Sequence, residues 1–153
     1  MSVFQNTISY ATFKQATPSL TLIADEWVKF GSSWEAVTEI QKEIDIVGNS
    51  GLSVKVNQIG TYYVDFSFIA NDGDGKTYSV APYVNATRLS HYALKFHQQA
   101  TQQKYEVSMG FIVPLTNTDQ LSFEIYVDTL PTLDLSITDA KISMFNLQQL
   151  GIH

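Results

Sequence analysis

The stretch from Leu121 to Asp128, LSFEIYVD, decides the fold class of this chain. Its odd-numbered residues are Leu, Phe, Ile and Val, and its even-numbered residues are Ser, Glu, Tyr and Asp. This alternation predicts a strand with one apolar face, because successive side chains of a strand point to opposite sides. The same alternation recurs in the segments 52–57, 64–69, 133–138 and 142–145. Five such segments argue strongly against a mainly helical fold.

Further runs rich in β-branched and aromatic residues complete the predicted strands. They are Ile8–Phe13, Leu20–Ile23, Trp27–Phe30, Thr77–Val84, Ala93–His97 and Tyr105–Leu115. Pro82 is expected where the strand needs no backbone donor. Turn residues separate the runs at 48–51, 71–75, 116–119 and 129–132. Only Ser33–Lys42 offers a short helical pattern, and an irregular loop fits it equally well. We therefore expect an all-β, antiparallel jelly-roll sandwich of about eight to ten strands.

Composition limits the classes of function. The chain has 153 residues, the size of one domain, with 44% apolar and only 16% charged residues. Charge below the usual ~25% suits a domain with several buried faces, including interfaces between subunits. The net charge of −6 argues against a nucleic-acid partner and against an anionic membrane surface.

Targeting and redox signals are few. The chain has no cysteine, which excludes a disulfide framework and a thiolate metal site. Its first residues lack the basic start and apolar core of a secretory signal. No stretch approaches the ~20 apolar residues of a membrane span. We therefore expect a protein used at its full length, or one exported by a route other than a signal peptide.

Four segments occur in a familiar order. Gly60-Thr61-Tyr62-Tyr63-Val64-Asp65-Phe66-Ser67-Phe68 places a Gly-x-Tyr at the start of an alternating strand, and a strand–turn–strand follows at Ser79–Leu89. An apolar run, a polar turn and an alternating strand follow at Val113–Ile125, and two closing strands at Leu133–Leu147. This order resembles the jelly-roll heads of the tumour-necrosis-factor and complement-globular-head type, including those of bacteriophage fibre and head-decoration proteins.

The resemblance has three implications. It implies a homotrimer in which aromatic residues of one sheet pack along a threefold axis. The likeness covers about Trp27 to Leu147; we place the jelly-roll domain at 18–153, preceded by residues 1–17 as an N-terminal arm or a first strand. The resemblance points to a virion structural protein that decorates a capsid or forms a fibre head, assembled in the host cytoplasm. Its partners would be copies of itself, other virion proteins such as capsid or fibre, and a host-surface glycan.

Catalytic and metal-binding signatures are weak. His91 and His97 would lie too far apart on one strand to share a metal unless the chain turned between them, so these and His153 are expected at the surface. The Asp-Gly-Asp-Gly-Lys sequence at 72–76 places a lysine where an EF-hand needs a ligand. A hairpin tip explains it better, although a calcium site shared between loops is left open. No nucleophile elbow or phosphate loop occurs. We therefore expect no enzyme activity, no cofactor and no metal site.

Tyrosines on the polar side of strands suggest two uses. Such residues either line a subunit interface or form a platform on which sugar rings stack. The candidates are Tyr63, Tyr83, Tyr105 and Tyr126. Loop-tip polar groups would complete a sugar site, and the candidates are Asn71, Asp72, Asp74, Asn85 and Arg88. The alternative function is therefore a lectin-like, carbohydrate-binding receptor module.

Overall fold

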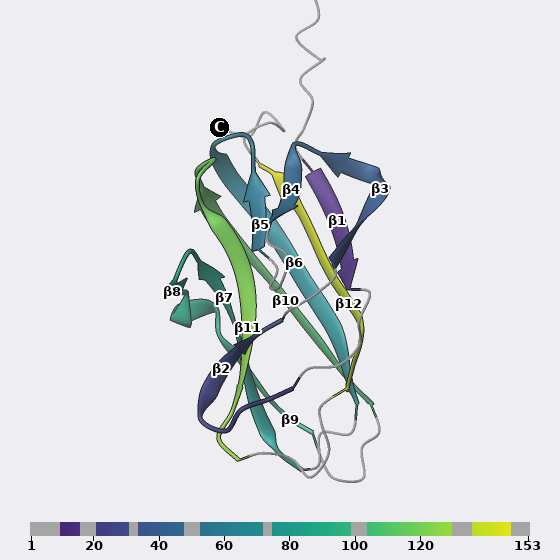
Figure 1. Cartoon of the computed structure of the whole chain (residues 1–153), viewed down its shortest axis with the longest axis vertical. Helices are drawn as coiled ribbons and strands as arrows, with labels where there is room; N and C mark the ends of the chain where they lie inside the picture. Colours follow the sequence, from purple (N-terminus) through teal and green to yellow (C-terminus); the bar gives the residue numbers. More distant parts are fainter. Residues whose placement is uncertain are drawn as a thin grey trace, which may run out of the picture.

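The computed structural model describes residues 10–15, 21–30, 34–47, 53–71, 75–98, 104–129 and 136–147. These residues form two antiparallel sheets packed face to face (Figure 1). Sheet A has five strands in the order β10-β6-β12-β1-β3. Sheet B has seven, with β4-β5-β11-β7-β8 in order, while β2 pairs with β11 and β9 pairs with β7. The jelly-roll sandwich predicted from alternation is confirmed.

The strands of sheet A are long. They are β1 (Tyr10–Gln15), β3 (Trp34–Lys42), β6 (Gly60–Asn71), β10 (Lys104–Leu115) and β12 (Ser136–Asn146). Those of sheet B are mostly shorter. They are β2 (Glu26–Lys29), β4 (Ile44–Val47), β5 (Ser53–Val56), β7 (Thr77–Val84), β8 (Thr87–Arg88), β9 (Leu94–His97) and β11 (Gln120–Val127). A single turn of 3₁₀ helix, η2 (Ser90–Tyr92), connects β8 to β9.

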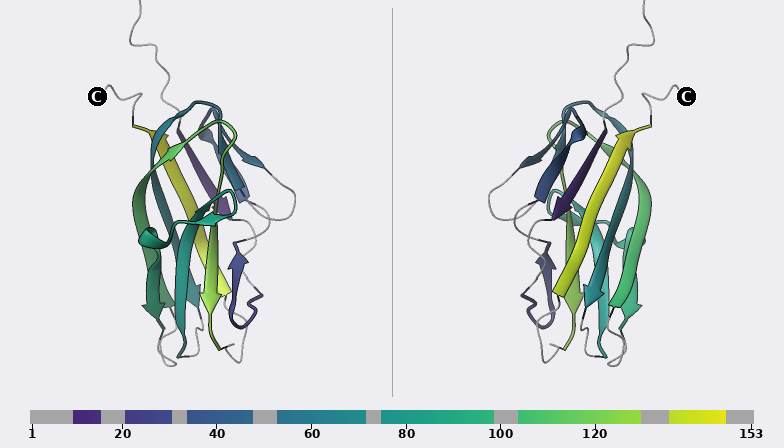
Figure 2. Two further views of the ribbon diagram at one scale, coloured as in Figure 1. Left: turned by 90° about the vertical axis from the view of Figure 1, so that its left-hand side faces the viewer. Right: turned by 90° about the vertical axis from the view of Figure 1, so that its right-hand side faces the viewer.

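The apolar faces of the two sheets meet in one core. Phe66 of β6 and Phe123 of β11 come from opposite sheets, and their rings stack with centroids 4.0 Å apart. Phe30, just after β2, closes this cluster with its ring 5.1 Å from those of Phe66 and Phe68. The outer faces of the two sheets therefore look in opposite directions (Figure 2, β12 and β1 nearest in the right view, β7 and β11 in the left).

The structure explains why a glycine and a proline occupy two positions noted in the sequence. A Cβ on Gly60 would collide with the side chain of Asn146, which is only 1% exposed, so the start of β6 requires a glycine. Pro82 lies in β7 where the flanking β9 has ended and β8 has not begun. Its carbonyl accepts a hydrogen bond from Leu89 N at 2.9 Å, and the ladder needs no donor from Pro82 there.

Three expectations about local structure were wrong. The segment predicted as a short helix or loop, Ser33–Lys42, is strand β3 over Trp34–Lys42, paired with β1. A short amphipathic stretch is marginal as a helix, and the open side of β1 provides hydrogen-bond partners instead. Residues 21–23 of the predicted strand Leu20–Ile23 are not in a strand. The described residues form twelve strands instead of eight to ten, partly because Glu43, with φ of 59°, separates β3 from β4.

Candidate functional site

The four tyrosines predicted as interface or ligand-face residues lie in three places. Tyr63 is on the outer face of sheet A, while Tyr83 and Tyr126 are on the outer face of sheet B. Tyr105 packs against the core, where its ring stacks on that of Phe96 with centroids 5.3 Å apart. The structure therefore brings two of the four together, and each sheet presents its own candidate surface.

The outer face of sheet A carries an apolar row that crosses four strands. Its members, each opposite the next in register, are Ile112 of β10, Tyr63 of β6, Phe145 of β12 and Tyr10 of β1. The rings of Tyr63 and Phe145 lie 5.5 Å apart, and Ile112 is 50% exposed. The other three members are half-buried, and a contiguous apolar row that is partly open to solvent marks a candidate contact surface.

Gly110 determines how the Tyr63 ring lies in this row. A Cβ on Gly110 would be 2.6 Å from Tyr63 Oη and 3.3 Å from its Cζ. The tyrosine therefore reaches sideways over β10 at the one position that has no side chain. Glycine inside a strand often marks such a close approach.

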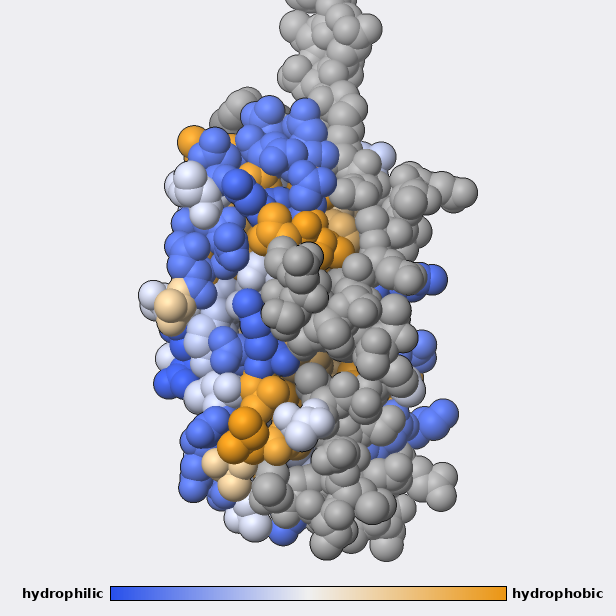
Figure 3. All heavy atoms as spheres, viewed as in Figure 1, coloured by the Kyte–Doolittle hydropathy of each residue, from blue (hydrophilic) through white to orange (hydrophobic). Residues whose placement is uncertain are grey.

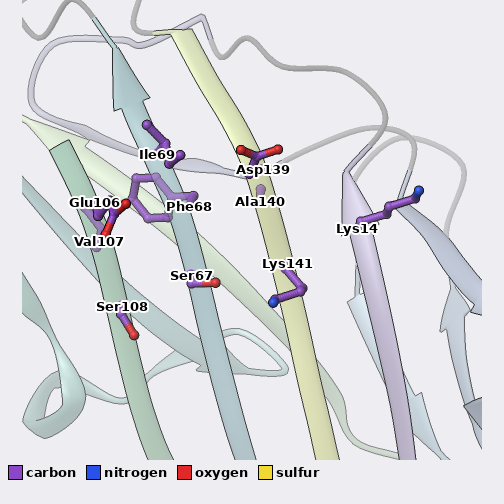
Figure 4. Close-up of a pocket in the computed structure, with 10 residues that line it drawn as sticks. All are labelled: Lys14, Ser67, Phe68, Ile69, Glu106, Val107, Ser108, Asp139, Ala140 and Lys141. Atoms are coloured by element: carbon purple, nitrogen blue, oxygen red, sulfur yellow. The ribbon is translucent and has the colours of Figure 1, made fainter. Parts of the chain in front are cut away.

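A hollow of about 610 Å³ lies on the same face, farther along the strands. Its lining comes from β10, β6, β12 and β1 and comprises Lys14, Ser67, Phe68, Ile69, Glu106, Val107, Ser108, Asp139, Ala140 and Lys141 (Figure 4). A β-bulge in β12 shapes one side, because Asp139 has a φ of 53° and the register with β6 shifts there. The hollow holds two lysines and two carboxylates.

The outer face of sheet B carries a second cluster, centred on Trp27 of β2. The Trp27 ring lies 5.4 Å from that of Tyr126 and 6.1 Å from that of Tyr83. The Arg88 guanidinium covers the Trp27 ring, with Cζ 4.6 Å from its centroid. Tryptophan, tyrosine and arginine are the side chains that most often dominate binding surfaces.

Two groups beside this cluster, Glu124 and Tyr126, have shifted pKa values. Burial raises the pKa of the Glu124 carboxyl, although Lys29 and Arg88 act against it. The hydrogen bond that Tyr126 Oη donates to Asp25 Oδ1, 2.8 Å long, raises the pKa of Tyr126.

The predicted loop-tip contacts are scattered. Asp72 and Asp74 lie outside the described residues, and Asn71 donates to Thr138 Oγ1 at 3.2 Å. Asn85, with φ of 56°, sits in the β7–β8 turn and donates to Asp119 Oδ1 at 3.0 Å. Both ends of the Asn85 amide are used, because its Oδ1 accepts a hydrogen bond from the backbone N–H of Gln120 at 3.1 Å. Only Arg88 joins the tyrosines.

No cluster of three potential metal ligands occurs among the described residues. His91 is exposed next to Tyr92, and His97 Nδ1 is hydrogen-bonded to Thr77 Oγ1 at 2.9 Å. Within the same part of the chain, no helix is long and apolar enough to cross a membrane.

No family model and no curated protein sequence matches this chain. Solved structures do match its fold. Murine APRIL matches with a TM-score of 0.64 and 10% identity, over 92% of this chain and 100% of its own. The Eiger TNF of S. frugiperda gives 0.59 and 16% identity, over 92% of each chain. The vertex protein P5 of phage PRD1 gives 0.62 and 10% identity, over 92% of this chain and 98% of its own.

The chain has a TNF-like jelly-roll fold. Within that fold, the residues that sequence reasoning missed are Trp27, Ile112 and Phe145. Ile112 and Phe145 are apolar residues at the outward phase of alternating strands, so the sequence did hold a signal for them. Trp27 had no such signal, because its neighbours come from distant segments. The side of the molecule seen in Figure 3 is mostly hydrophilic over its described residues, with hydrophobic ones in small groups.

Proposed function

We propose that this chain is the jelly-roll module of a homotrimer, and that the protomers meet through the outer face of sheet A. The apolar row from Ile112 to Tyr10 is the observation that carries the proposal. Rotation about an axis that runs along the strands keeps every residue at its own level. The apolar rows of the three copies therefore lie at one level, so that apolar groups face apolar groups across each contact. Burying the exposed half of Ile112 alone contributes about 1 kcal/mol per copy.

Two matched variants test the interface. Ile112→Asp places a charge in the proposed contact, so we expect the trimer to dissociate into folded monomers. Ile23→Asp is the control, because Ile23 is also 50% exposed but lies in the segment before β2, away from sheet A. Light scattering coupled to size exclusion measures the masses. A trimer that survives Ile112→Asp, or is lost equally in both variants, contradicts the proposed interface.

We further propose that the trimer is a structural, non-catalytic part of a virion, as a capsid decoration or a fibre head. The likeness to the vertex protein of phage PRD1 supports this proposal, since the two chains share a fold over nearly their full lengths. Labelling purified particles with an antibody to the chain, viewed by electron microscopy, tests it. Labelled vertices or fibre tips are expected, and particles that lack the protein would overturn the virion role.

The cluster around Trp27 supports a second candidate function, binding of a host-surface glycan. Aromatic rings beside Arg88 and Glu124 offer an apolar surface for the C–H face of a sugar and hydrogen-bonding groups for its hydroxyls. A glycan array compares the native chain with Trp27→Ala, and Ile23→Asp is again the control. Binding lost only in Trp27→Ala supports this function. An array on which the native chain binds nothing removes it.

A further inference from the structure

We propose that the hollow on sheet A pairs charges between neighbouring protomers, with Lys141 and Lys14 of one copy receiving Glu106 of the next. This inference rests on the proposed homotrimer and adds a specific contact to it. The hollow lies on the same face as the apolar row, and its residues come from the same four strands (Figure 4).

The two lysines are placed unfavourably for a single copy. Lys14 and Lys141 are directly opposite each other on β1 and β12, and both are exposed. Like charges at directly opposite positions of two strands disfavour their pairing, and the two side chains extend in opposite directions (Figure 4). In register, Ser67 is the other neighbour of Lys141, while Glu35 is the other neighbour of Lys14. Lys141 therefore carries the argument, because a serine gives it no counter-charge.

The hollow's carboxylates do not neutralise these lysines within one copy. No ion pair joins Glu106 or Asp139 to Lys14 or Lys141 in the described part of the chain. Strands β6 and β12 lie between β10 and β1, and adjacent strands are about 4.8 Å apart. The floor between them is low, because Ser67, Ser108 and Ala140 have small side chains. The hollow therefore has room for side chains from another molecule.

A second copy of the chain is the occupant that fits. Glu106 is exposed on β10, an edge strand of sheet A, while the lysines lie on the third and fourth strands counted from it. A threefold ring brings the edge of one copy onto the face of the next, because each contact joins two different patches. In register, Glu106 is only two residues along β10 from Ser108, the residue level with Lys141. The long, flexible side chain of Lys141 spans that offset. Rotating one copy about an axis parallel to the strands therefore brings the opposite charges together.

Charge reversals test the pairing. Glu106→Lys and Lys141→Glu are each expected to weaken the trimer roughly tenfold or more at low salt, with the loss shrinking as salt rises. Combining the two reversals should restore most of the affinity, because opposite charges face each other again. Glu26→Lys is the control, since it makes the same change at an exposed position on sheet B. Light scattering over a dilution series gives the dissociation constant of each variant.

The outcomes separate this inference from the proposed trimer. A native trimer whose dissociation constant is unchanged by Glu106→Lys overturns the charge pairing and leaves the trimer standing. A loss in Lys141→Glu without one in Glu106→Lys also overturns the pairing, because the lysine would then respond to another group. A native chain that is monomeric contradicts the trimer itself. Recovery in the combined variant, with Glu26→Lys unchanged, supports the pairing.

Discussion

Gly110→Ala should weaken the trimer while leaving the folding of each protomer nearly unchanged. The new Cβ would lie 2.6 Å from Tyr63 Oη, a separation that real side chains do not adopt. The Tyr63 ring must therefore swing away from the sheet, and it leaves the side of Phe145, whose ring is now 5.5 Å away. Since Tyr63 is in the middle of the apolar row, the row loses its level surface.

The magnitudes favour an effect on assembly over one on folding. Alanine in a strand is better than glycine by about 0.5–1 kcal/mol, and the displaced ring loses about 0.5–1.5 kcal/mol of aromatic packing. These two terms nearly cancel in the protomer. Assembly depends on a separate quantity, the apolar area that the displaced ring no longer buries against the next copy: about 40 Å² at ~25 cal/mol per Å² is about 1 kcal/mol per copy, or about 3 kcal/mol for the trimer. That corresponds to a roughly 100-fold weaker assembly.

The assay is light scattering across a dilution series, with circular dichroism melting of dilute protein to follow the fold. Tyr63→Phe combined with Gly110→Ala is the rescue, because it removes the hydroxyl that collides and leaves Cζ at a tight 3.3 Å. Tyr63→Phe alone serves as the baseline. If Gly110→Ala assembles as tightly as the native chain, Tyr63 does not lie at the interface and the reasoning fails.

Three further predictions concern the protomer. Phe123→Ala removes a core ring that is 1% exposed and stacked on Phe66, so urea unfolding should show a loss of about 3–5 kcal/mol. A loss under 1 kcal/mol would contradict the inter-sheet core. Glu124→Gln should raise the melting temperature at pH 7. Burial raises the folded pKa of the Glu124 carboxyl, so its ionisation lowers the free energy of unfolding as the pH climbs above the ordinary pKa of 4.5. The gain should vanish below that pH, and an equal gain at pH 3 would show that its cause is not ionisation. Asp119→Asn should lower the melting temperature at pH 7, because hydrogen bonds from Thr116 and Asn85 hold the pKa of Asp119 below its ordinary 3.8. The stabilisation from the ionised carboxylate is present above pH 3.8 and is lost as the pH falls through the folded pKa. A melting-temperature difference between the two proteins that persists at very low pH would argue against this cause.

Strands were predictable where one face is buried and the other is solvated. The bounds of β7, Thr77–Val84, agree with those read from the sequence, because each of its ends is marked by turn residues. Trp34–Lys42 was not predictable, because its pattern suits several conformations and pairing with β1 decides among them. Propensity alone has no access to such a partner.

The candidate surfaces were only partly predictable. Side chains alternate along β10, so Tyr105 points to the same side as Val107, toward the core. This alternation can be read from the sequence. The apolar row and the hollow depend on the strand order β10-β6-β12-β1, which no local pattern encodes. The Trp27 cluster likewise requires the short strand β2 to pair with β11. Contacts between distant segments were therefore missed even where the single strands were found.

The mass of the native chain in solution is the decisive measurement for the proposed homotrimer. Light scattering behind size exclusion should give three times the 17.1 kDa of one chain, with the mass falling only on strong dilution. That result would support the proposed trimer, and the variants of Ile112, Gly110 and Glu106 would then test whether the outer face of sheet A forms the contact. A mass of one chain at all concentrations would contradict the account and leave the Trp27 cluster as the surface to pursue.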